Sequence, residues 1–285
     1  MSTLDRKIDF AVVLSVSKAN PNGDPLNGNR PRQNYDGYGE ISDVAIKRKI
    51  RNRLQDLGEA VFVQSDDRKT DGFKSLKERA DSDKDLAKML KDNKASSDLF
   101  STIACEKWID VRAFGQVFAF KNSKISVGVR GPVSIHTATS IEPINIVTTQ
   151  ITKSVNSITG DKKGEDTMGM KHRVDFGVYV FKGSINTQLA EKTGFTYEDA
   201  EKIKQALVTL FENDSSSARP DGSMEVHNVY WWEHSSKLGQ YSSAKVHRSL
   251  QINAKTETPT AFNEENYAIE LHDLEGLTPE VLNGQ

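Results

Sequence analysis

The sequence predicts an α+β fold, because the pattern strand–helix–strand occurs twice along the chain. The first unit runs from Ile8 to Phe120 and the second from Val174 to Trp232, with insertions between them. Two such units can join their strands in one split β-α-β sheet. A chain of 285 residues is long enough to bury a substantial core in such a domain.

The composition restricts the functional classes. A formal net charge of -2 and a pI of about 6.3 do not indicate a globally basic protein, so any nucleic-acid surface must be a local patch. Cys105 is the single cysteine, which excludes an internal disulfide and a multi-cysteine zinc site and favours a reducing compartment. The N-terminus carries acids before a short alternating apolar run, so we expect a cytoplasmic protein without a signal peptide or membrane span.

The first predicted strand leads into a long loop. Apolar residues alternate from Ile8 to Val16, which is the two-residue period of a strand with one strongly apolar face. From Asn20 to Glu40, Gly, Pro, Asn and Asp are so dense that we expect irregular structure. Loops of this length inside a domain are usually functional or disordered.

A basic helix is predicted next, from Ser42 to Leu57, with Ser42 or Asp43 as its N-cap. It combines an apolar stripe, Ile46, Ile50, Leu54 and Leu57, with a basic arc, Lys47, Arg48 and Arg51. No acid lies between Asp43 and Asp56 to neutralise the arc, and like charges at this spacing repel, so an external polyanion would stabilise the helix. The alternative is an ordinary solvated face, which most Lys/Arg runs form.

The middle of the chain holds an insertion and two further strands. Residues 64–107 alternate acids and bases with weak helical periodicity, which predicts a solvated helical insertion, and strands are predicted at 108–120 and 125–135. Glycines in these strands suggest bulges or places where another backbone approaches closely. The run from Gly128 to Pro132 is either a bulged strand end or a glycine loop that admits a phosphate beside Arg130.

A projecting hairpin is predicted after these strands. Alternation from Ile144 to Val155 leads into a Gly- and charge-rich tip, Ser157 to Arg173, whose middle offers only Met168 and Met170 for burial. Exposed methionines form an adaptable apolar surface that can contact bases or a partner subunit. The alternative is a disordered tip.

The second unit repeats the strand–helix–strand order. A strand from Val174 to Ile185 precedes a helix that Thr196 opens, with Asp199 three residues later as an approximate capping box. Strands are predicted at 223–233 and 246–253, and the segment from residue 263 onward alternates loosely.

Candidate catalytic residues are few. The six histidines form no i, i+4 pair, and scattered aspartates such as Asp24, Asp36 and Asp110 are usually turn formers. We therefore expect a binding protein with no catalytic residue, cofactor or resident metal.

Six motifs, in order along the chain, carry a resemblance to a known family. They are NPNGDP (20–25), SDVAIKRKIRNRL (42–54), DVRAFGQV (110–117), VRGPVSI (129–135), TMGMKH (167–172) and AEKTGF (190–195). With them the chain resembles, along nearly its whole length, the backbone-forming subunit of the type I-C CRISPR Cascade surveillance complex, in the seventh Cas family. Six motifs in one order are far more specific than any single one.

The resemblance implies a modified RNA-recognition-motif palm of the ferredoxin-like kind, a helical insertion and a β-hairpin thumb. The expected boundaries are residues 1–63, 108–140 and 174–262 for the palm, 64–107 for the insertion, 141–173 for the thumb and 263–285 for a C-terminal segment. The usual Lys/Arg-Gly-Phe/Tyr-x-Phe signature is missing. We therefore expect Phe114, Phe118 and Phe120 to be core residues rather than a platform on which bases stack.

The resemblance also implies that basic and amide side chains hold the guide backbone, since such groups donate to phosphate and sugar oxygens. The predicted RNA-binding residues are Asn20, Asn22, Asn29, Arg30, Arg32, Lys47, Arg48, Arg51, Arg130, Met168, Met170, Lys171 and His172.

The resulting hypothesis is a non-catalytic subunit that polymerises along CRISPR RNA and presents it for pairing with target DNA in antiviral defence. Its partners would be CRISPR RNA, target DNA, further copies of itself, and the guide-processing end subunit and large subunit of Cascade. One alternative is a metal-dependent RNA endonuclease of the type III backbone kind, using Asp24 or Asp36. Another is a protein-interaction scaffold that binds no RNA.

Overall fold

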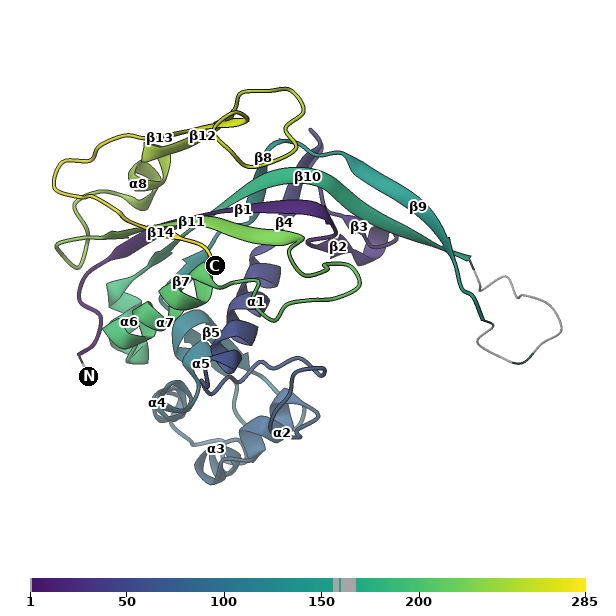
Figure 1. The fold of residues 1–285 in the computed structure, drawn as a ribbon. Helices are drawn as coiled ribbons and strands as arrows, with labels where there is room; N and C mark the ends of the chain where they lie inside the picture. Colours follow the sequence, from purple (N-terminus) through teal and green to yellow (C-terminus); the bar gives the residue numbers. More distant parts are fainter. Residues whose placement is uncertain (1, 156–158, 160–167) are drawn as a thin grey trace.

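A central antiparallel sheet organises the computed structural model, which describes residues 2–155, 159 and 168–285 (Figure 1). Its strand order is β14 (Glu280–Asn283), β11 (Met224–Glu233), β1 (Ile8–Ala19), β10 (Met168–Ile185), β8 (Ala138–Pro143) and β4 (Tyr38–Ile41). β7 (Val133–Ile135) and β9 (Ile146–Thr152) also pair with β10. The predicted mixture of helices and strands is confirmed, as a mixed α/β fold.

The first strand is buried on both faces. Phe10, Val12 and Leu14 belong to the core beneath the helices, as the alternation predicts. The intervening residues Ala11 and Val13 are also buried, in a second cluster on the opposite face. The expectation of a single strongly apolar face was therefore too narrow, because the C-terminal part of the chain covers the other side.

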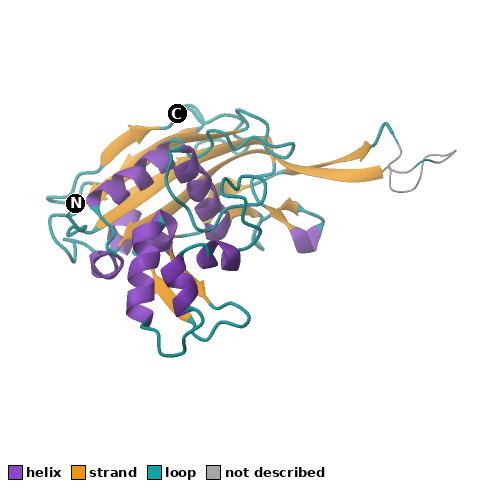
Figure 2. Cartoon of the chain, turned by 90° about the horizontal axis from the view of Figure 1, so that it is seen from below, coloured by secondary structure: helices purple, strands orange, loops and turns teal. Residues whose placement is uncertain are grey.

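Helices cover the first face of the sheet (Figure 2). They are α1 (Asp43–Asp56), α5 (Ile109–Phe114), α6 (Thr187–Thr193) and α7 (Tyr197–Val208). Ser42 caps α1 by accepting from the backbone N–H of Ala45 at 3.2 Å. Ile46, Ile50 and Leu54 of the predicted stripe are buried, whereas Leu57 is the C-cap and only partly buried. The capping box of α7, between Thr196 and Asp199, is also present. Both helix predictions are confirmed.

A second core lies below these helices in Figure 1. It joins α2 (Leu76–Asp81), α3 (Lys84–Met89) and α4 (Ser97–Lys107) to a two-stranded sheet of β5 (Gly115–Phe118) and β6 (Val127–Arg130). Phe118 is fully buried there against Phe62 and Phe100, with ring centroids 5.0 Å apart in both pairs. Phe114 and Phe120 pack against core clusters, so the expectation that these three rings belong to the core is confirmed.

The opposite face of the sheet is covered by α8 (Ser243–Ser249) and the pair β12 (Leu250–Ala254) and β13 (Tyr267–Leu271). A buried polar contact joins the segment after β11 to β1: His234 Nε2 lies 2.8 Å from an oxygen of Asp9. The backbone N–H of Gln240 donates to His234 Nδ1 at 3.0 Å, so Nε2 carries the proton and donates to Asp9.

Two strand predictions were partly wrong. Residues 109–114 form α5, and only 115–118 form a strand, because Asp110 accepts from the backbone N–H groups of Phe62 and Val63 and fixes a helical turn there. Gly115 ends the turn at φ 80°, a left-handed conformation that favours glycine. Residues 243–249 likewise form α8, so the strand expected from residue 246 begins at Leu250.

The predicted irregular loop contains short ordered elements. Between β1 and α1 lie β2 (Gly23–Asp24), the 3-10 turn η1 (Pro25–Asn27) and β3 (Arg30–Pro31), followed by β4. β2 pairs with β3 as a small hairpin. The composition could not show this pairing, since each strand is only two residues long.

A long hairpin extends from the sheet (Figure 1). β9 pairs with the first part of β10 from Thr152 opposite Met168 to Ile146 opposite Val174. Most of the tip predicted at 157–173 lies outside the described residues. Of the helices that the structure describes, none is both long and apolar enough to cross a membrane.

Candidate nucleic-acid interface

The asparagines of the loop before α1 shape the loop itself. Asn20 Nδ2 donates to the backbone oxygen of Asn29 at 2.7 Å, which ties the end of β1 to the turn between β2 and β3. Asn22 Oδ1 accepts from the backbone N–H of Ser42 at 2.9 Å and so joins the loop to the start of α1. A Cβ at Gly23 would lie 2.0 Å from Asn29 Oδ1, so the glycine leaves room for the Asn29 side chain in its observed position. These three amides therefore position the loop.

Arg30 links this loop to the base of the long hairpin. Its guanidinium donates to Thr148 Oγ1 of β9 at 3.1 Å and lies 3.5 Å from His172 Nδ1 of β10. Thr148 and His172 also contact each other at 2.8 Å. Arg30 has no carboxylate partner among the described residues, so its charge is available to an anion at this junction.

Lys171, beside His172, joins the hairpin to a third segment. Its ammonium donates to the backbone oxygen of Ser217 at 2.9 Å. In the same loop, Asp214 forms ion pairs with Lys49 of α1 and with Arg219, the latter at 3.2 Å. The structure thus brings the start of α1, the β2–β3 hairpin, the loop of residues 213–219 and the hairpin base into one region.

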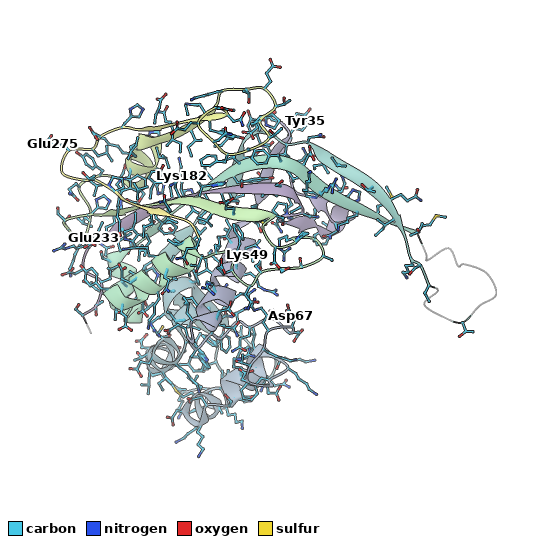
Figure 3. The ribbon with its side chains drawn as sticks, viewed as in Figure 1. Tyr35, Lys49, Asp67, Lys182, Glu233 and Glu275 are labelled. Carbon is cyan, nitrogen blue, oxygen red and sulfur yellow. The ribbon has the colours of Figure 1, made fainter. Side chains whose placement is uncertain are left out.

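A polar cavity of about 300 Å³ lies between α1, the β2–β3 hairpin and the loop of residues 213–219. Its charged lining residues are four bases, Arg48, Lys49, Arg68 and Arg219, and two acids, Asp67 and Asp214. Figure 3 shows Lys49 and Asp67 on the same side of the sheet. The excess of bases makes this cavity attractive to an anion.

Arg48 is the most exposed base of this cavity on α1. Its guanidinium lies 3.4 Å from Asp67, and the two side chains are 51% and 74% exposed. Exposed ion pairs of this kind contribute only about 0 to 1 kcal/mol, so a phosphate can replace Asp67 at little cost. Arg48 also lines a second cavity, of about 450 Å³, that it shares with the segment from residue 64 to 79.

Lys49 is a cavity residue that the sequence argument missed. Burial lowers the pKa of Lys49 to about 8, against the opposing influence of the Asp214 carboxylate. Its ammonium also lies 5.4 Å from the ring centroid of Phe211. Arg68 and Arg219 were missed too, because each lies in a loop without a periodic pattern that would point to α1.

Other predicted residues lie apart from this cavity. Arg51 Nε donates to Asp110 at 2.9 Å, and this carboxylate is 1% exposed. Lys47 pairs with Asp43 at 2.9 Å. The premise that no acid neutralises the basic arc is therefore wrong: Asp43, Asp67 and Asp110 each contact one of its members.

Arg130 lies on β6, in the small sheet of the second core. The glycine run beside it brings two backbones together, since a Cβ at Gly131 would lie 2.3 Å from the backbone oxygen of Ala113. Such a close approach of another backbone was expected of the glycines in these strands. Arg130 itself is exposed and forms no ion pair with any described residue.

The remaining predicted residues lie on the two hairpins. Arg32 contacts Asp24 at 3.5 Å. Met168 and Met170 are 64% and 56% exposed on β10, which agrees with an adaptable apolar surface.

The aspartates of the nuclease alternative do not form a site. Asp24 Oδ1 accepts from the backbone N–H of Leu26 at 3.2 Å and so caps η1, as expected of a turn former. Asp36 is exposed in a turn. Among residues 2–155, 159 and 168–285, no group of three or more His, Cys, Asp or Glu side chains is arranged to hold a metal ion.

Comparisons with known proteins agree with a single family. The family model described as CRISPR-associated protein Cas7 matches residues 6–272. A protein of Haloferax volcanii with the same name is 28% identical over 238 residues, which are 76% of this chain and 67% of that protein. A chain of a solved CRISPR RNA-guided surveillance complex in a pre-nicking state is 14% identical. It has a TM-score of 0.50, with 79% of this chain and 78% of that chain covered, which shows a likeness of fold.

Proposed function

The chain belongs to the CRISPR-associated Cas7 family, and from this premise we propose that it is a non-catalytic backbone subunit that holds CRISPR RNA in a Cascade surveillance complex. The match of the family model over nearly the whole chain is the observation that carries the proposal. The solved relative belongs to an RNA-guided complex, and the basic cavity beside α1 supplies a surface of suitable charge. The type I-C subtype remains a prediction from the motifs.

The strand order supports an RNA-recognition-like palm. Four strands of the sheet follow one another along the chain as β1, β8, β10 and β11. Across the sheet they lie in the order β11, β1, β10, β8, so the fourth strand lies beside the first and the third beside the second. α1 follows the first strand and α7 the third, and both pack on one face. A split β-α-β palm of the ferredoxin-like kind would have this order, which supports the proposal. We propose residues 1–63, 108–140 and 174–262 as the palm.

The long hairpin supports a thumb. We propose residues 141–173 as the thumb, 64–107 as the helical insertion and 263–285 as the C-terminal segment. The exposed methionines 168 and 170 give the thumb an apolar surface beside the basic residues Lys171 and Arg30. Such a surface would cover the guide or contact the next copy of the chain.

The RNA backbone would pass from the hairpin base to the cavity beside α1. Arg30, Lys171 and His172 lie at one end of this path and Arg48 at the other, with Asn20, Asn22 and Asn29 shaping the wall. Arg32, Lys47 and Arg130 remain predicted contacts outside the cavity. We exclude Arg51, because its buried ion pair with Asp110 removes it from the surface.

A subunit of this kind leaves sequence recognition to base pairing between guide and target, so phosphate contacts suffice. Head-to-tail copies along one RNA, together with the end and large subunits of the complex, would complete the assembly. The arrangement of Asp24 and Asp36 gives no observation that favours the nuclease alternative.

Purification with co-expressed guide RNA tests the proposal. The ratio of absorbance at 260 and 280 nm should show bound nucleic acid, and two unrelated RNAs of equal length should bind with equal affinity. A protein that purifies without nucleic acid and binds neither RNA would favour the scaffold alternative. Regularly spaced cleavage of complementary RNA with magnesium would favour the nuclease.

A further inference from the structure

A third cavity lies on the face of the sheet opposite α1. It has a volume of about 370 Å³, and its walls come from β8, β10, β12 and the segment that joins β7 to β8. Figure 3 shows Lys182 between β10 and the C-terminal cover, whereas Lys49 lies below the sheet. The sheet itself therefore separates this cavity from the one of about 300 Å³ beside α1.

Lys182 of β10 gives this cavity a positive charge without a counter-charge. Its ammonium donates to the backbone oxygen of His247 at 2.7 Å, and it forms no ion pair with any residue that the structure describes. Burial alone lowers the pKa of Lys182, with no carboxylate opposing the effect. Charged groups removed from water are normally paired, so an unpaired half-buried ammonium beside a cavity suggests that an external anion completes it.

The other residues that line the cavity indicate which kind of anion it fits. His136, Thr137 and Thr139 offer exposed donors beside Lys182, and four aliphatic side chains form the other wall: Ile141, Val180, Leu250 and Ile252. Among the described residues that line the cavity there is no Phe, Tyr or Trp, and the imidazole of His136 is the single aromatic ring, so the large stacking platforms typical of single-strand binding are missing. One cation among aliphatic residues instead matches a carboxylate flanked by aliphatic groups.

The neighbouring strand favours an extended ligand. Leu250 and Ile252 belong to β12, which pairs only with β13 among the described strands. An unpaired strand edge presents backbone N–H and C=O groups to which an extended peptide can bind.

We propose that this cavity binds an acidic peptide segment of a partner protein, in which an Asp or Glu between aliphatic residues places its carboxylate on Lys182. The segment would bind on the face opposite the proposed RNA path, so protein and RNA partners would not compete. The proposal does not depend on the proposed RNA-binding function.

Binding of short blocked peptides to the full chain tests this proposal. The probes are a pentapeptide with a central Glu between two valines and the same peptide with Gln, and the readout is the methyl NMR shifts of Ile141, Val180, Leu250 and Ile252. The Glu peptide should shift these resonances and bind at least about tenfold more tightly than the Gln peptide, since the Gln amide has the shape of Glu but lacks the charge that pairs with Lys182.

Substitutions locate the charge that the peptide requires. Lys182→Met should remove the preference for Glu over Gln, while the matched control Lys192→Met, on α6 and exposed, should keep it. If Lys182→Met unfolds the chain, His136→Gln, at an exposed position, provides a second variant that should weaken the Glu peptide about threefold or more. Equal binding of the two peptides, or methyl shifts elsewhere only, would overturn the proposal. So would a single-stranded oligonucleotide that shifts these methyl groups at lower concentration than the Glu peptide.

Discussion

Two arginines of the basic arc on α1 contrast in what they contact. Arg48 is half exposed, meets an exposed aspartate at 3.4 Å and lines a cavity with an excess of bases. Arg51, three residues later, lies against the buried Asp110 and over the ring of Phe114, 5.0 Å from its centroid. Arg48 and Arg51 thus have different roles, although they are of the same type and lie about one helical turn apart. One can bind an external anion, and the other stabilises the fold.

The largest effect on stability should come from the buried ion pair of Arg51 with Asp110. Asp110→Ala removes the partner of Arg51 and also leaves the backbone N–H groups of Phe62 and Val63 without their acceptor. Breaking a buried pair in this way costs about 3 to 5 kcal/mol. We expect urea unfolding to show this loss in the free energy of unfolding. Asp67→Ala is the matched control, because it removes the partner of the exposed Arg48, and it should change stability by less than about 1 kcal/mol.

Lys49 lies beside Arg48 in the sequence of α1 but is buried against Asp214, and its burial can be tested through pH. Below about pH 8, Lys49 of the folded protein is a buried ammonium, which costs stability. Between about pH 8 and 10.5, Lys49 of the folded protein has released its proton, whereas Lys49 of the unfolded chain still binds it. The contribution of Lys49 to stability therefore rises with pH over this range and is constant above it.

The measurement is the free energy of unfolding of the wild type minus that of Lys49→Met as a function of pH. This difference should increase by on the order of 2 kcal/mol across that range. A difference that stays flat from pH 7 to 11 would contradict the buried position of the ammonium.

Arg48→Ala should weaken RNA binding without unfolding the chain. The loss of one phosphate contact at a half-exposed site is expected to lower affinity about 5- to 10-fold, equally for unrelated RNA sequences. Fluorescence anisotropy at fixed salt would measure it. A loss confined to one RNA sequence would contradict a backbone contact.

Lys47→Ala should have the smallest effect. Its pair with Asp43 is a helical i,i+4 contact between partly exposed side chains, which contributes about 0.3 to 0.5 kcal/mol. We expect a loss of stability of that size by thermal or urea unfolding and a smaller loss of RNA affinity than for Arg48→Ala. A larger loss of affinity than for Arg48→Ala would place the RNA on the other flank of α1.

Periodicity predicted the parts of the fold that depend on local pattern. The apolar stripe of α1 and the capping box of α7 follow from spacing and cap chemistry, and both are present. The helical conformation of residues 109–114 could not be predicted from periodicity, because the apolar residues of this segment suit a strand equally well. Its helical turn depends on Asp110 meeting backbone groups 47 and 48 residues earlier in the chain.

For the candidate site, too, contacts between segments distant in the sequence could not be predicted. The sequence revealed the bases of α1 and of the loop before it, since they are dense in one stretch. It could not show that Asp110 and Asp67 approach two of them, nor that the loop of residues 213–219 adds Arg219 to the cavity. Ion pairs between distant segments are set by the tertiary fold.

The salt dependence of RNA binding tests the central claim most directly. The slope of log K against log salt should fall by about 2 when Arg30, Arg48 and Lys171 are all replaced by Ala, since each phosphate contact on a single strand contributes about 0.7. Arg51→Ala, measured where it remains folded, should leave the slope unchanged. A slope that falls for Arg51→Ala and not for the triple variant would contradict the division of the arc.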